Sequence, residues 1–190
     1  MISHEHKCAF VHIPKTAGRS VGLAFGKRDQ FHKSIDVLKK EIGDEKYYFF
    51  SVVRNPLDRM VSMYFYLKNK NEFPYEQNMT FDDFIKEGKE WWDSKPLDLS
   101  TKNKEIKNFY FSPQTMWIAR GGKIEVDKVI KFEKLNEQFQ FIIERFNLKN
   151  NLPHTNASSH NHYSTYYNKN SKSLVKEWFE SDFNMFYNLL

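Results

Sequence analysis

Residues 10–20, FVHIPKTAGRS, combine residue types that suit the binding of an anion. An apolar run stops at a proline, and a lysine, hydroxyl groups and a glycine follow. If the run is a buried strand that turns into a helix, backbone N–H groups and the helix dipole favour phosphate or sulfate at the turn. Lys15 adds a charge, Thr16 and Ser20 add hydroxyls, and Gly18 lets the backbone approach. The alternative is an ordinary strand-to-helix turn with a solvated lysine.

A second stretch with similar chemistry is SVVRNPLDRMVS, residues 51–62. Arg54 stands at the end of an apolar, β-branched run, and Ser62 falls two turns into the helix that we expect next. The guanidinium fork and a hydroxyl group can together hold a second phosphate. An arginine at a strand end is also a common salt-bridge partner, so the residues alone leave both interpretations open.

The elements that must position these groups alternate between strands and helices. We expect strands at 7–13, 46–54 and the start of 126–135. We expect helices at 16–27, 34–43, 55–69, 79–88, 112–119, 136–148 and 171–190. This alternation predicts an α/β sandwich of three layers with a mainly parallel sheet, as a single domain over 1–190. Ligands bind at the carboxyl ends of such strands, so both stretches should face one crevice.

Composition and charge narrow the class of protein. The 190 residues are 40% hydrophobic and 17% aromatic, which excludes a disordered chain. Lys and Arg number 29 against 24 acidic residues, and this net charge of +5 is too small to indicate nucleic acid unaided. Cys8 is the single cysteine, so an internal disulfide is excluded.

The sequence also bears on location. The first residues, MISHEHK, lack the apolar segment of a signal peptide, and no apolar run approaches the length of a membrane span. We therefore expect a cytoplasmic protein without a transmembrane segment. Nothing in the sequence indicates an oligomeric state.

Together, the two stretches resemble sulfotransferases that use 3′-phosphoadenosine 5′-phosphosulfate (PAPS). HIPKTAGRS is similar to the 5′-phosphosulfate loop of the carbohydrate branch, H-x-P-K-T-A-G-T-S, and VVRNPLDRMVSMYF to the 3′-phosphate motif, V-R-[DN]-P-x-x-R-x-x-S. SPQTMWI, VIKFEKL, LPHTNASSHNHY and SDFNMFY also resemble the family in order, so the resemblance covers almost the whole chain. It implies a P-loop-like sulfotransferase fold that moves a sulfuryl group from PAPS to an acceptor hydroxyl, leaving 3′-phosphoadenosine 5′-phosphate (PAP).

The resemblance also implies which residues bind the nucleotide. The 5′-phosphosulfate would be held by the first loop, at Lys15, Thr16, Ala17, Gly18, Arg19 and Ser20. The 3′-phosphate would be held by Arg54 and Ser62. Arg19 departs from the usual threonine, and it is either a charged donor in place of the hydroxyl or a side chain that points away and weakens binding.

Two residues would carry the chemistry. Lys15 is placed to neutralise the leaving oxygen during in-line displacement. His32 resembles the histidine that precedes a small helix between the two phosphate motifs of carbohydrate-type relatives, and an imidazole suits a general base. The alternative for His32 is a surface histidine at a helix start. The reaction needs no metal, and no metal-ligand spacing is convincing.

The sequence says least about the acceptor and the residues that contact it. Gln114 and Trp117 lie in a segment that faces the cleft in relatives, and His160 lies in a late loop; these are candidate acceptor contacts. Asn156 and Ser159 lie where that loop would cover the nucleotide. Carbohydrate is the default acceptor because the motif wording resembles that branch, while lipid, small-molecule and peptide-tyrosine acceptors stay open.

Two other functions compete with sulfuryl transfer. One is a small P-loop-like kinase, but the Walker pattern places Lys-Ser/Thr after the last glycine, whereas Lys15 precedes Gly18. The other is a non-catalytic module that keeps the fold and binds PAP or another nucleotide without turnover. Titration with PAP and with ATP distinguishes a sulfotransferase from a kinase. An assay of turnover distinguishes a sulfotransferase from the non-catalytic module.

Overall fold

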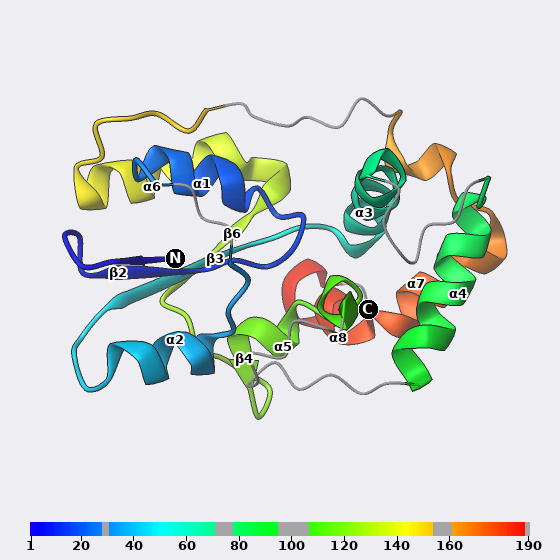
Figure 1. The fold of residues 1–190 in the computed structure, drawn as a ribbon, viewed down its shortest axis with the longest axis horizontal. Helices are drawn as coiled ribbons and strands as arrows, with labels where there is room; N and C mark the ends of the chain where they lie inside the picture. Colours follow the sequence, from blue (N-terminus) through cyan, green and yellow to red (C-terminus); the bar gives the residue numbers. More distant parts are fainter. Residues whose placement is uncertain (28–30, 71–77, 95–106, 154–160, 189–190) are drawn as a thin grey trace. The chain divides into compact units, whose positions relative to one another are not determined.

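The computed structural model describes residues 1–27, 31–70, 78–94, 107–153 and 161–188 (Figure 1). The chain forms two compact units. Unit 1 comprises Met1–Arg54 and Gln114–Asn156, and unit 2 comprises Asn55–Pro113 and Ala157–Leu190. The two units are compact groups of residues, and their existence does not test the prediction of a single domain over 1–190.

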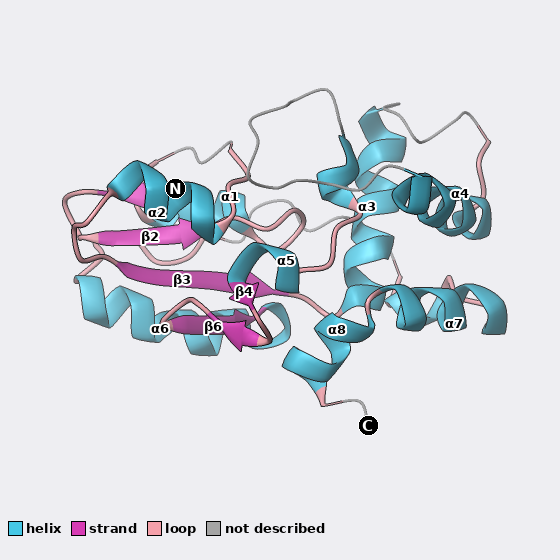
Figure 2. Cartoon of the chain, turned by 90° about the horizontal axis from the view of Figure 1, so that it is seen from below, coloured by secondary structure: helices cyan, strands magenta, loops and turns pink. Residues whose placement is uncertain are grey.

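Unit 1 is built on a four-stranded sheet in the order β1-β2-β3-β6. The strands are β1 (Ile2–Ser3), β2 (Cys8–Val11), β3 (Tyr48–Val53) and β6 (Lys128–Lys131). Strands β2, β3 and β6 are parallel, and β1 pairs antiparallel with β2 at the edge (Figure 2). The apolar runs of β2 and β3 suit central positions, since parallel strands are covered on both faces. The predicted mixed α/β fold with a mainly parallel sheet is confirmed.

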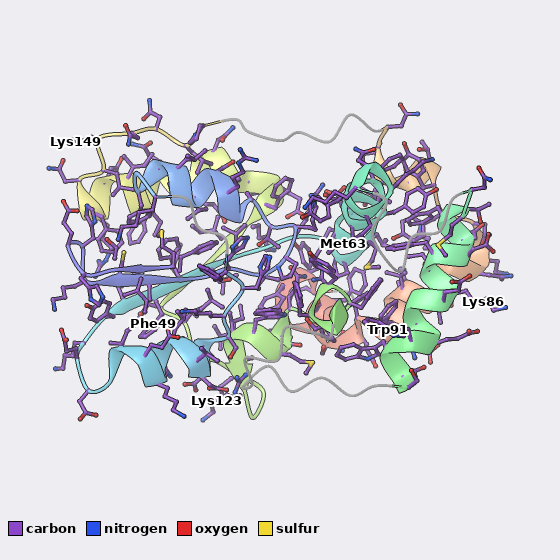
Figure 3. All side chains as sticks on the ribbon, in the orientation of Figure 1. Phe49, Met63, Lys86, Trp91, Lys123 and Lys149 are labelled. Atoms are coloured by element: carbon purple, nitrogen blue, oxygen red, sulfur yellow. The ribbon has the colours of Figure 1, made fainter. Side chains whose placement is uncertain are left out.

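Helices cover both faces of this sheet. Helices α1 (Gly18–Ala24) and α6 (Leu135–Phe146) lie on one face, and α2 (Ile35–Ile42) lies on the other (Figure 1). The core under α1 and α6 consists of apolar side chains from both layers: Cys8, Phe10, Val21, Ala24, Phe25, Phe50, Val52, Ile130, Phe139 and Ile142. Because strand side chains alternate, Phe49 points to the opposite face (Figure 3).

Several short elements of unit 1 were not predicted. They are β1, the 3-10 helix η2 (Phe132–Lys134), and the antiparallel hairpin of β4 (Ala119–Arg120) and β5 (Lys123–Ile124). The hairpin turns through Gly121 and Gly122, whose φ angles are 52° and 75°. The Gly-Gly pair is a known hairpin signal, but strands of two residues leave little apolar pattern to read.

Unit 2 consists of helices around an aromatic core. Its helices are α3 (Pro56–Lys70), α4 (Phe81–Ser94), α7 (Lys169–Trp178) and α8 (Glu180–Asp182), with short turns η1 (Lys107–Tyr110), η3 (Tyr163–Thr165) and η4 (Phe183–Tyr187). Met63 and Trp91 point into this unit and Lys86 points away (Figure 3). Arg59 is fully buried in the core, where it donates to the Ser112 carbonyl over 2.7 Å and stacks on Phe179.

Two predicted helix ends in unit 2 were wrong. Gly88 does not end α4, which continues to Ser94. A Cβ at position 88 would lie 2.7 Å from a ring carbon of Phe111, so the glycine serves close packing and not a helix stop. The long closing helix expected at 171–190 instead ends at Trp178 and is followed by α8 and the π-helical turn η4.

The burial of Cys8 in β2 leads to a prediction about its reactivity. Its side chain is fully buried, and burial raises its pKa to about 12 even though Lys27 and the N-terminal ammonium favour the thiolate. At pH 8 the thiol is therefore protonated as well as inaccessible. We expect Ellman's reagent to label the native protein at least ~1,000-fold more slowly than the unfolded protein, since labelling requires opening of the core.

The matched control is the same protein in guanidinium chloride, where the single cysteine should react to one equivalent. Rapid stoichiometric labelling of the native protein would contradict the burial of β2.

Candidate functional site

Two strand ends bring the first loop and Arg54 to the same edge of the sheet. Strands β2 and β3 are parallel neighbours, with Val11 opposite Ser51. The chain then leaves β2 into the loop at residues 12–17 and leaves β3 at Arg54. In parallel α/β sheets this carboxyl edge is where ligands bind.

The first loop has an unusual backbone conformation. Lys15 and Ala17 have φ angles of 65° and 63°, in the left-handed region that residues with a Cβ rarely adopt. Each such residue costs about 1–3 kcal/mol and persists only where its surroundings enforce it, and such strain gathers at functional sites. The buried Thr16 helps to enforce the turn, because its hydroxyl donates to the Ile13 carbonyl over 2.8 Å. Left-handed Ala17 followed by helical Gly18 is the backbone sequence of an anion-binding nest.

Gly18 is required by close contact with His12. A Cβ at position 18 would lie 1.9 Å from the Nε2 atom of His12, so no other residue fits without moving that ring. The His12 ring is buried and stacks on Phe10 at a centroid distance of 5.7 Å. Helix α1 has only seven residues, so its dipole is a weak attraction for an anion, and the loop amides and basic side chains are the stronger candidates.

His32 lies against this loop and does not project into solvent. Its ring centroid is 4.2 Å from that of His12, and its Nδ1 lies 3.0 Å from the His12 carbonyl. A carbonyl can only accept, so Nδ1 carries the proton. In the neutral imidazole Nε2 is then the unprotonated nitrogen, which is the form that a general base needs. The ring also meets the edge of Trp117 at 6.3 Å.

Arg54 connects the two strand ends. Its Nη1 donates to the carbonyl of Lys15 over 3.3 Å, and its guanidinium lies 4.1 Å above the ring of Phe132, just after β6. Only 7% of the residue is exposed. Its main-chain N–H and C=O each bond the side chain of Gln114 at 2.8 Å. The structure thus brings the basic residues of both predicted motifs together.

The remaining predicted residues fall into three groups. Ser20 is buried, Ala17 is half-buried and Arg19 is exposed, all at the start of α1. Gln114, the N-cap of α5 (Thr115–Ile118), and Trp117 within this helix are both buried, which favours a supporting role over contact with an acceptor.

The third group comprises the predicted residues that the structure does not place beside the first loop or Arg54. Ser62 is buried on α3 in unit 2, so its pairing with Arg54 in unit 1 stays a prediction from the spacing of the motif. Asn156, Ser159 and His160 lie outside the described residues.

Two residues of the site were missed in the sequence. His12 begins the first motif, and its place directly after a buried strand was the available signal. Phe132 follows β6 at the same edge, but a single aromatic residue in VIKFEKL gives no sign that it will stack on an arginine.

Comparison with known proteins gives one family. A family model for the sulfotransferase family matches residues 1–188, which include both predicted motifs and all but the last two residues of unit 2. No curated protein and no solved structure shows significant similarity to the chain. Within the residues that the structure describes, no helix is long and apolar enough to cross a membrane. Because one family model spans nearly the whole sequence, the resemblance seen in the motifs is confirmed, and the chain belongs to the sulfotransferase family.

Proposed function

We propose that the protein transfers the sulfuryl group of PAPS to a hydroxyl group of a carbohydrate acceptor, with His32 as the general base. Membership of the sulfotransferase family makes the chain a sulfuryl transferase in the broad sense. The observation that carries the finer proposal is the hydrogen bond from the Arg54 guanidinium to the Lys15 carbonyl. It joins Arg54 of the second motif to the loop that carries Lys15 at one sheet edge, which supports a single site for two phosphate groups.

The residues of the first loop fit a phosphosulfate group. The left-handed conformations of Lys15 and Ala17 and the start of α1 suit a loop whose amides converge on an anion. Lys15 supplies the charge, with Arg19 as an exposed second cation and Ser20 as a hydroxyl on α1. The Thr16 hydroxyl already donates to a loop carbonyl, so its role is to hold the loop in shape.

Arg54 is the centre of the proposed 3′-phosphate site. A guanidinium has five N–H donors and can hold a carbonyl and a phosphate at once. Its stacking on Phe132 and its bond to the loop hold it rigid before any ligand arrives. Ser62 would add its hydroxyl, on the spacing of eight residues that the motif shares with the family.

The chemistry divides between Lys15 and His32. PAPS supplies a sulfuryl group whose departure leaves negative charge on the bridging oxygen. The Lys15 ammonium would stabilise that charge, and the Nε2 of neutral His32 would take the proton of the acceptor hydroxyl. The Nδ1 bond to the His12 carbonyl fixes the tautomer that this role needs. The carbohydrate acceptor rests on the wording of the motifs alone.

The first prediction tests the nucleotide. PAP should bind more tightly than AMP or ATP, and Arg54→Ala should weaken PAP by about 1.5–3 kcal/mol, as expected for hydrogen bonds to a charged group. Binding of AMP should weaken less than binding of PAP, because AMP lacks the 3′-phosphate and loses only the support that Arg54 gives to the first loop. Calorimetric titration of each nucleotide measures the difference.

A matched control for this test is Arg145→Ala, because Arg145 also stacks on an aromatic ring of unit 1, at 4.1 Å from Tyr48. It should leave PAP binding unchanged. If PAP and AMP bound equally well to the unsubstituted protein, the 3′-phosphate assignment would be wrong, and preference for ATP would favour a kinase.

The second prediction concerns Lys15. Lys15→Ala should lower kcat by roughly 100-fold, the scale of losing one group that stabilises transition-state charge, while PAP affinity falls much less. Alanine keeps a Cβ, so the left-handed strain at position 15 is retained. Steady-state kinetics with a sulfated-acceptor readout, together with PAP titration, separate the two effects.

Lys39→Ala removes a surface lysine paired with Glu125 and serves as the control for lost charge. If Lys15→Ala had a normal kcat and weaker nucleotide binding, Lys15 would only bind the phosphate and would not stabilise the transition state.

The third prediction concerns His32. His32→Ala should lower the rate by about 100-fold or more while PAP still binds, because base catalysis contributes typically 10²–10⁴-fold. His32→Asn can keep a donor to the His12 carbonyl but has no basic nitrogen, so it should be equally slow. The rate of the unsubstituted enzyme should fall at acidic pH, because a protonated ring cannot accept a proton.

Recovery of activity in His32→Asn would show that the side chain holds the loop and does not act as the base. A near-normal rate in both variants would exclude His32 from the chemistry altogether.

A further inference from the structure

The side chain of Gln114 forms a double hydrogen bond with the main chain of Arg54. Its Oε1 accepts from the Arg54 N–H and its Nε2 donates to the Arg54 carbonyl, each over 2.8 Å. Gln114 is fully buried. A primary amide that bonds both main-chain groups of one residue reproduces the pairing of a neighbouring strand.

This contact begins where the sheet ends. Strand β3 stops at Val53, whose register partner on β6 is Lys131, so Arg54 lies one residue beyond the ladder. Gln114 takes over as the partner of the main chain at that point. Its own position is set by α5, whose first turn is closed by the Trp117 N–H bonding the Gln114 carbonyl at 3.0 Å.

The contact also joins two places where the chain crosses between units. Unit 1 ends its first segment at Arg54 and resumes at Gln114, so 59 residues of sequence separate the bonded partners. Gln114 therefore fixes the main chain of Arg54 against the segment that returns to the same unit.

We propose that Gln114 is a positioning residue that holds Arg54 for recognition of the 3′-phosphate, an inference that rests on the proposed function. The guanidinium can meet a phosphate and the Lys15 carbonyl together only if its main chain is fixed. Gln114 does this through its amide, whose oxygen and nitrogen both bond the main chain of Arg54. It thereby determines the preference for a nucleotide with a 3′-phosphate without touching the nucleotide.

The test compares two ligands in the same protein. Gln114→Met removes both hydrogen bonds with little change in volume, and Gln114→Asn keeps the amide but shortens the side chain so that it cannot span both bonds. Each variant should weaken PAP by about tenfold while AMP changes by less than about twofold, where tenfold corresponds to about 1.4 kcal/mol.

A matched control is Ser51→Ala. The buried Ser51 hydroxyl donates to the Val11 carbonyl over 2.8 Å, so this change also removes a side-chain bond to main chain near the end of β3. It should lower thermal stability without changing the ratio of PAP to AMP affinity. Either folded Gln114 variant with an unchanged ratio would overturn the inference, as would an equal loss for both ligands.

A measurement on the unsubstituted protein decides the matter if neither variant folds. The NMR signals of the Gln114 side-chain amide should shift on addition of PAP and much less on addition of AMP, because only PAP engages Arg54. Equal shifts, or none, would refute the coupling. If the unsubstituted protein does not prefer PAP to AMP, the proposed function itself fails, and that result is distinct from a failure confined to Gln114.

Discussion

The parallel pairing of β2 with β3 is the constraint on which the rest of the site depends. It sets the exits of two strands side by side, so that the loop carrying Lys15 and the residue Arg54 share one edge. The loop is strained at two residues with left-handed backbone, at a cost of about 1–3 kcal/mol each. Thr16 and the Arg54 guanidinium each donate to a carbonyl of the loop. The strained backbone is thus held by one local bond within the loop and by one bond from the end of β3.

The larger elements follow from local pattern, and the smaller ones do not. The apolar runs predicted β2 and β3, and the Asn-Pro start predicted α3, which runs from Pro56 to Lys70. Gly88 was misread as a helix stop because a glycine that relieves a packing contact and a glycine that ends a helix look alike in sequence. The contact with Phe111 that decides between them is separated by more than twenty residues.

In the candidate site, too, some residues could be predicted from the sequence and others depend on contacts in space. Lys15 and Arg54 were predicted from the motifs and His32 from the resemblance; the structure brings them to one strand edge, and their roles stay predictions. The contacts that support them were missed or given another role, because they depend on distance in space: His12 fills the room that a glycine leaves, and Gln114 bonds main chain only. A main-chain bond leaves no complementary residue type in the sequence by which to predict it.

The contact between the loop and Arg54, which lies outside the motif, means that the motif is not portable. A designer who grafted HIPKTAGRS between a strand and a helix of another α/β scaffold would transfer the lysine but not the guanidinium that binds its carbonyl. The transplanted segment would lose one of the contacts that hold Lys15 and Ala17 in left-handed backbone, and it would be freer to relax toward ordinary dihedrals. The smallest fragment that includes both partners of this contact is therefore the pair of parallel strands with both of their exits, and not the nine-residue segment.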